Sequence, residues 1–297
     1  MAYNNLNILV LLRETNDPRP PARVITRGAG ISDRGLRRIP NPADLVALEE
    51  ALRLKDTFGA RVTVLAIGPS RLDDTLALAF SMGADRGIRF NEHGLEGGDG
   101  VADARVLARI TTILAPTLIF SGNRLADRGD DPAPALAAAT SGIPCISAAV
   151  SLRFVKDRVE VLRKADRGGR QEVSAEFPAM VLFDEGATPR YPSVDDINLA
   201  LTRTVEKWDL ANLGLPFWEI GPTGSRLTLA EFGVPRQDPV RVVTPDATLP
   251  AFERILALLS GGIKAREGRT HLLSAEETAD SLWRILCEEG VVTQAEG

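Results

Sequence analysis

NILVLL, residues 7–12, is a short run of apolar residues with no polar alternation after Asn7. A strand that is buried on both faces has this composition, because its alternate side chains pack against helices on opposite sides of the sheet. Residues 62–67 (VTVLAI) and 117–121 (TLIFS) have the same character. These three runs predict the central strands of a parallel sheet.

A long polar stretch, residues 13–40, follows the first run and is expected to contain a small hairpin or excursion near residues 22–26. Segments with helical spacing separate the apolar runs. Residues 41–44 (NPAD) place a capping residue, a proline and an acidic residue at the start of one such segment, and Gly59 follows its end. Apolar stripes predict further helices over residues 70–83, 103–114 and 130–141, and Ser70 is expected to cap the first of these. The alternation of strands with helices predicts an α/β fold, a Rossmann-like and mostly parallel sheet with helices on both faces.

The pattern changes after residue 150. Residues 151–154, 158–163 and 171–175 predict a small antiparallel extension, and residues 178–183 predict a strand that returns to the core. From about residue 204 onward no sheet pattern persists, so we expect a sheet domain over residues 1–203 and a C-terminal arm over residues 204–297. The arm ends in an amphipathic helix and has too little core of its own, so we expect it to lie on another chain or to wrap its own domain.

Composition excludes several classes of function. The 297 residues carry 35 Lys and Arg against 40 Asp and Glu, a net charge of −5, so there is no basic excess for binding nucleic acid. Cys145 and Cys287 are too few for a disulfide framework, and His93 and His271 belong to no metal-ligand motif, so no metal site is expected. With no signal peptide and no run of ~18 apolar residues, we expect a cytoplasmic protein without membrane insertion.

The strand ends are the candidate binding positions, since ligands of open parallel sheets lie beyond the carboxyl ends of the strands. Gly68 and Gly122 follow two predicted strands and permit a close approach of the backbone to a ligand. A helix start near Asp131 is a possible phosphate site, although the same glycines could simply form strand-to-helix turns. No GxSxG, HExxH or Walker A motif occurs, so no catalytic residue is predicted.

Five segments in order carry a resemblance: ILVLLRETNDP (8–18), NPADLVALEEALRLKD (41–56), VTVLAIGPS (62–70), MGADRGI (82–88) and FPAMVLFDEGATPRYPSV (177–194). As an ordered set they resemble the beta subunit family of electron transfer flavoproteins, including its nitrogen-fixation-type relatives. The similarity extends over about residues 7–215, which is most of the predicted sheet domain. The resemblance implies a recognition loop after the last core strand and an obligate alpha-subunit partner.

The same resemblance implies an electron carrier and no enzyme. Such a carrier accepts electrons from a flavin-dependent dehydrogenase and passes them to a quinone reductase or another acceptor. Its alpha subunit holds most of the FAD, while the beta subunit binds AMP or, in electron-bifurcating relatives, a second FAD; we expect AMP here. Two alternatives stay open: a bifurcating subunit with a second FAD, and a stand-alone adenine-nucleotide-binding module of the stress-protein type.

The family's positions around the nucleotide correspond in this chain to Leu11, Asn41, Pro42, Ala43, Asp44, Ile67, Gly68, Gly122, Asn123, Asp127, Asp131, Pro132 and Ala133. Residues 131–134 depart from the family, which commonly has Asn/Ala-Gln-x-Gly where this chain has Asp-Pro-Ala-Pro. Proline has no N–H, and Asp131 places a carboxylate where a phosphate should approach. We therefore expect a phosphate that is held differently or bound more weakly.

The resemblance also assigns the docking of the dehydrogenase to Lys164, Arg190, Tyr191 and Val194. Val194 stands at the position of the family's apolar anchor, which is often leucine, and Lys164 stands where glutamate is frequent. A reversed charge at a docking surface changes the choice of partner and not the fold. We therefore expect a dehydrogenase partner other than the common acyl-CoA type.

Overall fold

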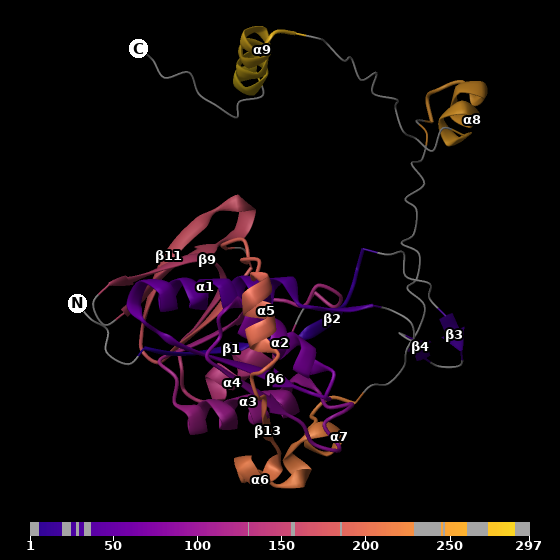
Figure 1. Cartoon of the computed structure of the whole chain (residues 1–297). Helices are drawn as coiled ribbons and strands as arrows, with labels where there is room; N and C mark the ends of the chain where they lie inside the picture. Colours follow the sequence, from indigo (N-terminus) through magenta and orange to yellow (C-terminus); the bar gives the residue numbers. More distant parts are fainter. Residues whose placement is uncertain are drawn as a thin grey trace. The chain divides into compact units, whose positions relative to one another are not determined.

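The apolar runs of the sequence form the centre of a nine-stranded sheet in the described residues of the computed structural model (Figure 1). The structure describes residues 6–19, 25–27, 30–32, 37–129, 131–155, 158–184, 186–228, 245, 247–259 and 273–288. The chain divides into two units, Met1–Gly233 and Val234–Gly297. The first unit holds the sheet, and the second holds two helices, α8 (Ala251–Leu259) and α9 (Ala275–Glu288).

The sheet has the order β11-β10-β9-β12-β8-β1-β6-β7-β13. All neighbouring pairs are parallel except β9–β10 and β10–β11, which form the antiparallel extension. The strands are β1 (Asn7–Leu11), β6 (Arg61–Ile67), β7 (Arg86–Phe90), β8 (Leu118–Gly122), β9 (Cys145–Val155), β10 (Arg158–Lys164), β11 (Arg170–Glu176), β12 (Ala179–Phe183) and β13 (Glu206–Trp208). Two small antiparallel pairs accompany them, β2 (Glu14–Asn16) with β5 (Arg38–Pro40) and β3 (Ile25–Arg27) with β4 (Gly30–Ser32).

Helices cover both faces of the sheet. Helices α1 (Pro42–Phe58) and α2 (Leu72–Met82) pack on one face, and α3 (Gly100–Leu114) and α4 (Ala133–Thr140) pack on the other. The remaining helices of the first unit are short: α5 (Val194–Ala200), α6 (Leu210–Leu213), α7 (Gly221–Gly224) and 3₁₀ turns at Asp166–Gly168 and Phe217–Glu219. Among the residues that the structure describes, no helix is both long and apolar enough to cross a membrane.

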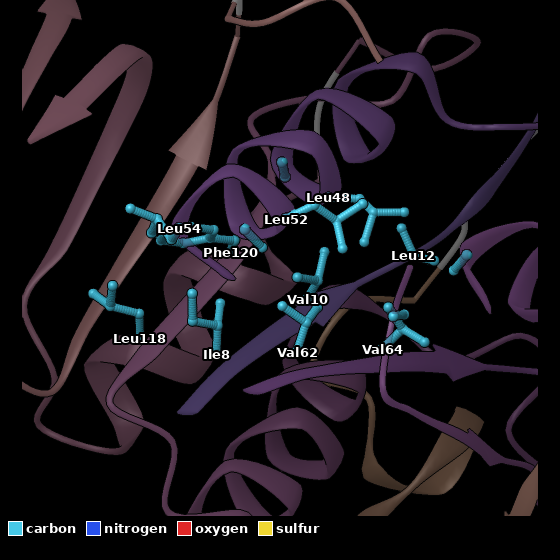
Figure 2. Packing of buried hydrophobic residues seen from close by; sticks show 14 of the residues in the cluster. Ile8, Val10, Leu12, Leu48, Leu52, Leu54, Val62, Val64, Leu118 and Phe120 are labelled. Atoms are coloured by element: carbon cyan, nitrogen blue, oxygen red, sulfur yellow. The ribbon is translucent and has the colours of Figure 1, made fainter. Parts of the chain in front are cut away.

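Alternate residues of β1 enter two separate apolar clusters. Ile8, Val10 and Leu12 pack with Leu48 and Leu52 of α1, as Figure 2 shows. Leu9 and Leu11 point to the opposite face, into the cluster that contains residues of α3 and α4. A strand that is buried on both sides explains why this segment has no polar alternation. The predicted fold class is confirmed.

Three local predictions were wrong. Helix α3 begins at Gly100 and not near residue 103, because Asp99 accepts hydrogen bonds from the N–H groups of Val101 and Ala102 and caps it. The position before α2 is Arg71, and no side chain caps that helix. A strand does follow residue 204: β13 pairs in parallel with β7, and its three residues are too few to show an alternating pattern.

Other predictions fall partly outside the described residues. An excursion near residues 22–26 was expected, and β3 begins at Ile25, whereas residues 22–24 lie outside the described part of the chain. His271 also lies outside it. The division at residue 203 and the contact of the arm with another chain stay predictions.

We expect Phe120→Ala to lower the free energy of unfolding by about 3–5 kcal/mol. Phe120 is fully buried in β8, and its ring meets that of Phe183 edge to face with centroids 5.1 Å apart, so truncation leaves a cavity in the centre of the sheet. Denaturant unfolding followed by circular dichroism measures the change. Ile113→Ala, at a half-exposed position of α3, is the control, and an equal loss in both variants would contradict this packing.

Candidate functional site

A cavity lies where the connections of the sheet diverge. From β1 the chain continues to β6 and β7 on one side, whereas β8 and β12 lie on the other, so the switch point of the topology is at the carboxyl ends of β1 and β8. The cavity has a volume of about 630 Å³, a size that suits a small-molecule ligand. We name it the strand-end cavity; its lining includes Leu11, Arg13, Ile67, Gly68, Asp131 and Ala133.

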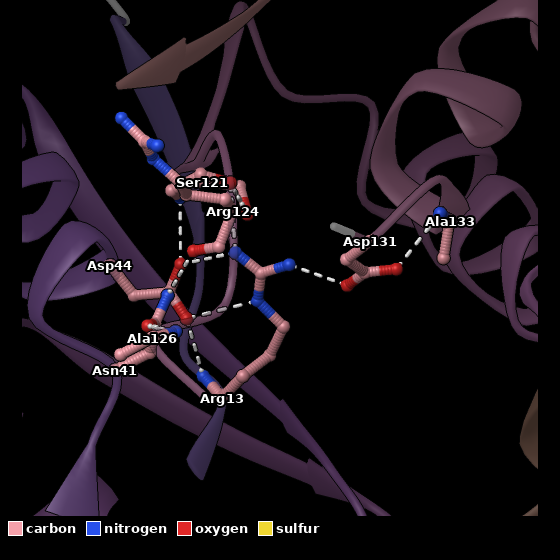
Figure 3. Close-up of polar contacts among 9 residues, drawn as sticks. Arg13, Asn41, Asp44, Ser121, Arg124, Ala126, Asp131 and Ala133 are labelled. Atoms are coloured by element: carbon pink, nitrogen blue, oxygen red, sulfur yellow. Dashed lines mark hydrogen bonds and ion pairs between the residues drawn. The ribbon is translucent and has the colours of Figure 1, made fainter. Parts of the chain in front are cut away.

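The buried carboxylate of Asp44 fixes the geometry behind this cavity. Asp44 is in the first turn of α1, and its side chain is 1% exposed. Its Oδ2 accepts hydrogen bonds from the backbone N–H of Arg13 (2.8 Å) and from Arg13 Nε (3.0 Å), and its Oδ1 accepts from Arg13 Nη2 (2.6 Å) and from the N–H of Gly122 (2.7 Å). One carboxylate therefore joins α1 to the ends of β1 and β8 (Figure 3).

Gly122 permits this arrangement because α1 begins directly against it. A Cβ atom at Gly122 would lie 2.6 Å from both the Cβ of Ala43 and Oδ1 of Asp44. The close backbone approach that the sequence predicts at this glycine is thus an approach to helix α1. Gly68 differs, since it lines the strand-end cavity and has a φ of +142°, which L side chains rarely adopt.

Arg13 follows β1 at the switch point, and its guanidinium is already engaged. Besides its bonds to Asp44, Nη2 donates to the carbonyl of Gly122 at 2.8 Å, and Nη1 donates to Oδ2 of Asp131 at 2.5 Å. These bonds use four of the five N–H groups of the side chain. Burial acts to lower the pKa of Arg13, but the carboxylates of Asp44 and Asp131 outweigh it and raise the pKa above its ordinary value.

Asp131 caps the start of α4. Its Oδ1 accepts a hydrogen bond from the N–H of Ala133 at 3.0 Å, while Oδ2 faces Arg13. Pro132 and Pro134 have no N–H to offer at this end of the helix. The position at which a helix terminus and an arginine would hold a phosphate therefore contains a carboxylate of the chain itself. The cavity fits an adenosine-sized group, but the described arrangement leaves no free anion position beside Arg13.

Asp103 faces the strand-end cavity from the first turn of α3. The pKa of Asp103 is raised to about 6, mainly by burial and in part by the nearby carboxylates of Asp131 and Asp99, whereas Arg128 acts in the opposite direction. The sequence places Arg13 at one of the strand ends where a ligand is expected but gives it no role, and it does not single out Asp103. Arg13 directly follows the first buried run, so its position was a usable signal, whereas the position of Asp103 depends on where α3 starts.

Five of the thirteen nucleotide-site residues predicted from the resemblance line this cavity: Leu11, Ile67, Gly68, Asp131 and Ala133. Asn41 instead binds the loop after β8, since its Nδ2 donates to the carbonyl of Arg124 and its Oδ1 accepts from the N–H of Ala126. Pro42 and Ala43 lie in the first turn of α1 with Asp44. Asn123 and Asp127 accept hydrogen bonds from the N–H groups of Ala148 and Asn16, respectively.

The four predicted docking residues divide into two kinds. Tyr191 and Val194, just before and at the start of α5, are 97% and 73% exposed. Arg190 is held by α1, because it donates to Glu49 at 2.9 Å and to Asp56 at 2.8 Å. Lys164 donates to Oδ2 of Asp184 at 2.8 Å. Tyr191 and Val194 therefore follow closely after Arg190, whose ion pairs with α1 attach this segment to the sheet domain.

We expect Asp103→Asn to stabilise the protein at about pH 7.5 by about 2 kcal/mol, because a carboxyl whose pKa rises from 3.8 to about 6 on folding is penalised when ionised. Since the folded state binds the proton more tightly, the stability of the wild type should rise relative to the variant as the pH falls through 6 toward 3.8. Thermal melting of both proteins across this range measures the difference. A difference that does not change with pH would contradict the assigned pKa.

Comparison with known proteins supports one family. A family model described as the electron transfer flavoprotein domain matches residues 29–213. The electron transfer flavoprotein subunit beta of Clostridium acetobutylicum is 32% identical over 218 residues, which cover 71% of this chain and 83% of that protein. Protein FixA of Azotobacter vinelandii is 32% identical over 216 residues, covering 69% and 76%. The electron transfer flavoprotein subunit beta of Bacillus subtilis is 27% identical over 257 residues, covering 86% and 98%.

The matched region includes most of the sheet, Asp44 and Gly122, and most of the strand-end cavity, whereas Arg13 precedes it. The resemblance found in the ordered sequence segments is therefore confirmed by an independent family model and by relatives matched over most of their length. This chain belongs to the electron transfer flavoprotein beta subunit family.

Proposed function

We propose that this chain is the beta subunit of a heterodimeric electron transfer flavoprotein. The complex accepts electrons from a flavin-dependent dehydrogenase and passes them toward a quinone reductase or another acceptor. The observation that supports this most is the family match, which extends over the sheet that builds the strand-end cavity. In this role the chain is a carrier subunit and not itself an enzyme, and its residues shape a binding site and a docking surface.

The proposed cofactors are FAD, held mainly by the alpha subunit, and an adenine nucleotide in this chain. The flavin supplies the electron transfer when bound. For the nucleotide, the position of the strand-end cavity at the switch point of the sheet and its volume of about 630 Å³ support an adenosine group lined by Leu11, Ile67 and Gly68. We favour AMP, held through its adenosine part because Asp131 takes up the donors that would meet the phosphate; a second FAD is the alternative and would make the complex electron-bifurcating.

The docking surface for the dehydrogenase is proposed at Tyr191 and Val194. Both side chains are strongly exposed, and the neighbouring Ile197 is also exposed, which gives an apolar surface at α5. Exposed apolar side chains of this kind suit the buried centre of a protein interface. We propose a dehydrogenase other than the acyl-CoA type, since Lys164 reverses a charge that is frequent in the family; efficient reduction by an ordinary acyl-CoA dehydrogenase would contradict this part.

The complex itself provides the first test. Co-expression with an alpha subunit should give a yellow heterodimer, and extraction should release FAD together with AMP. Extraction of FAD alone, at about two per heterodimer, would identify the bifurcating alternative. A colourless homodimer that binds ATP or AMP without a partner would identify a stand-alone nucleotide-binding module and exclude the proposed function. The absorption spectrum and chromatography of the extracted nucleotides distinguish these outcomes.

We expect Val194→Asp to slow reduction of the complex by its dehydrogenase by about tenfold or more, because an interface that desolvates this position would bury an unpaired charge. Stopped-flow measurement of flavin reduction follows the rate, and the flavin content checks that the complex is intact. Ile113→Asp, at a half-exposed position on α3, is the matched control. Equal rates in the wild type and the Val194 variant would exclude this residue from the docking surface.

A further inference from the structure

We infer that Asp131 occupies the anion position of the strand-end cavity and competes with the phosphate of a nucleotide for Arg13. The inference rests on the proposed function for the class of ligand, and it concerns the selectivity of that site. In this arrangement the cavity accepts the adenosine part of a ligand directly, whereas a phosphate binds at Arg13 only after the Asp131 side chain has turned away. Asp131 is thus a specificity-determining residue.

The contacts of Asp131 are those that a bound anion makes. One carboxylate oxygen accepts from the guanidinium of Arg13 at 2.5 Å, and the other accepts from the N–H of Ala133 in the first turn of α4 at 3.0 Å. A guanidinium together with a helix N-terminus is a common way for a protein to bind phosphate. Because both donors already serve one carboxylate, they are not available to a second anion at the same time.

The backbone around Asp131 is not free to move aside. A Cβ atom at Gly100 would lie 2.6 Å from Cγ of Pro132, so the segment before α4 packs closely against the start of α3. Pro132 also has a fixed φ, which restricts this segment further. The carboxylate must therefore leave Arg13 by rotation of its own side chain, and the start of α4 stays in place.

The local charge also disfavours an added anion. The positive charge of Arg13 is already matched by the carboxylates of Asp44 and Asp131, which gives this group a net charge of −1. Asp103 faces the same cavity and is close enough to Asp131 for the two carboxyls to interact. A phosphate would add negative charge beside these carboxylates, whereas the hydroxyl groups of a ribose would not. Arg71 and Arg128 also line the cavity, and Arg71 is paired with Glu14. The charges directly beside Arg13 therefore select against a phosphate at that position.

The test is calorimetric titration of the purified, nucleotide-free full-length chain with AMP and with adenosine. In the wild type, AMP should bind no more tightly than adenosine. In Asp131→Asn, which removes the charge but keeps a carbonyl oxygen for the N–H of Ala133, AMP should bind about tenfold more tightly than in the wild type, while the affinity for adenosine should change less than about twofold. Asp131→Ala should shift the AMP affinity in the same direction.

The control is Asp85→Asn, which removes a carboxylate from another ion pair, Lys55–Asp85 at 2.5 Å, at the opposite end of the sheet strands. Thermal melting of all variants verifies that they are folded. If the ratio of the AMP affinity to the adenosine affinity is the same in the wild type and in both Asp131 variants, the inference about Asp131 is wrong. The strand-end cavity would then still be a nucleotide site. If neither ligand binds any of these proteins, the strand-end cavity is not a nucleotide site, and both proposals for it fail.

Discussion

The ion pair between Asp44 and Arg13 is the interaction on which the geometry of the site depends. Strands β1 and β8 pair from Ile8 and Leu118 to Val10 and Phe120, and beyond these residues the two chain segments separate. Asp44 bridges the gap, because its carboxylate bonds both to Arg13 after β1 and to the N–H of Gly122 at the end of β8. A carboxylate so deeply buried requires partners of this kind. The cavity forms where the sheet opens and the ion pair keeps the opening fixed.

The order and type of the main elements could be predicted because their signals are local. Continuous apolar runs identify strands that are covered on both faces, and Asn41 with Pro42 marks the start of α1. The missed features depend on contacts that the local pattern does not contain. Helix α3 starts before the predicted residue 103 because Asp99 caps it. Strand β13 forms because its three residues pair with the edge strand β7, which is distant in the sequence.

The candidate site was only partly predictable for the same reason. The rule that ligands bind at strand ends locates Gly68, the neighbourhood of Gly122 and the helix start near Asp131, and the resemblance contributes Asp44. Asp44 and Asp131 hold the same guanidinium because β1 and β8, which are distant in the sequence, lie side by side in the sheet. The sequence predicts that the Asn41 side chain caps α1, but this side chain instead holds the loop after β8. The sequence shows which polar and charged residues are present, whereas the contacts between them follow only from the tertiary structure.

Helix α1 connects two parts of the protein that have separate tasks. Its first turn carries Asp44, and Glu49 and Asp56 along the same 17-residue helix hold Arg190 in front of the exposed Tyr191 and Val194. A helix of this length is a stiff rod of about 25 Å. The same rod therefore anchors the exposed segment after Arg190 and, through Asp44, the ends of β1 and β8, so that a single helix sets the spacing between the outer surface and the strand ends.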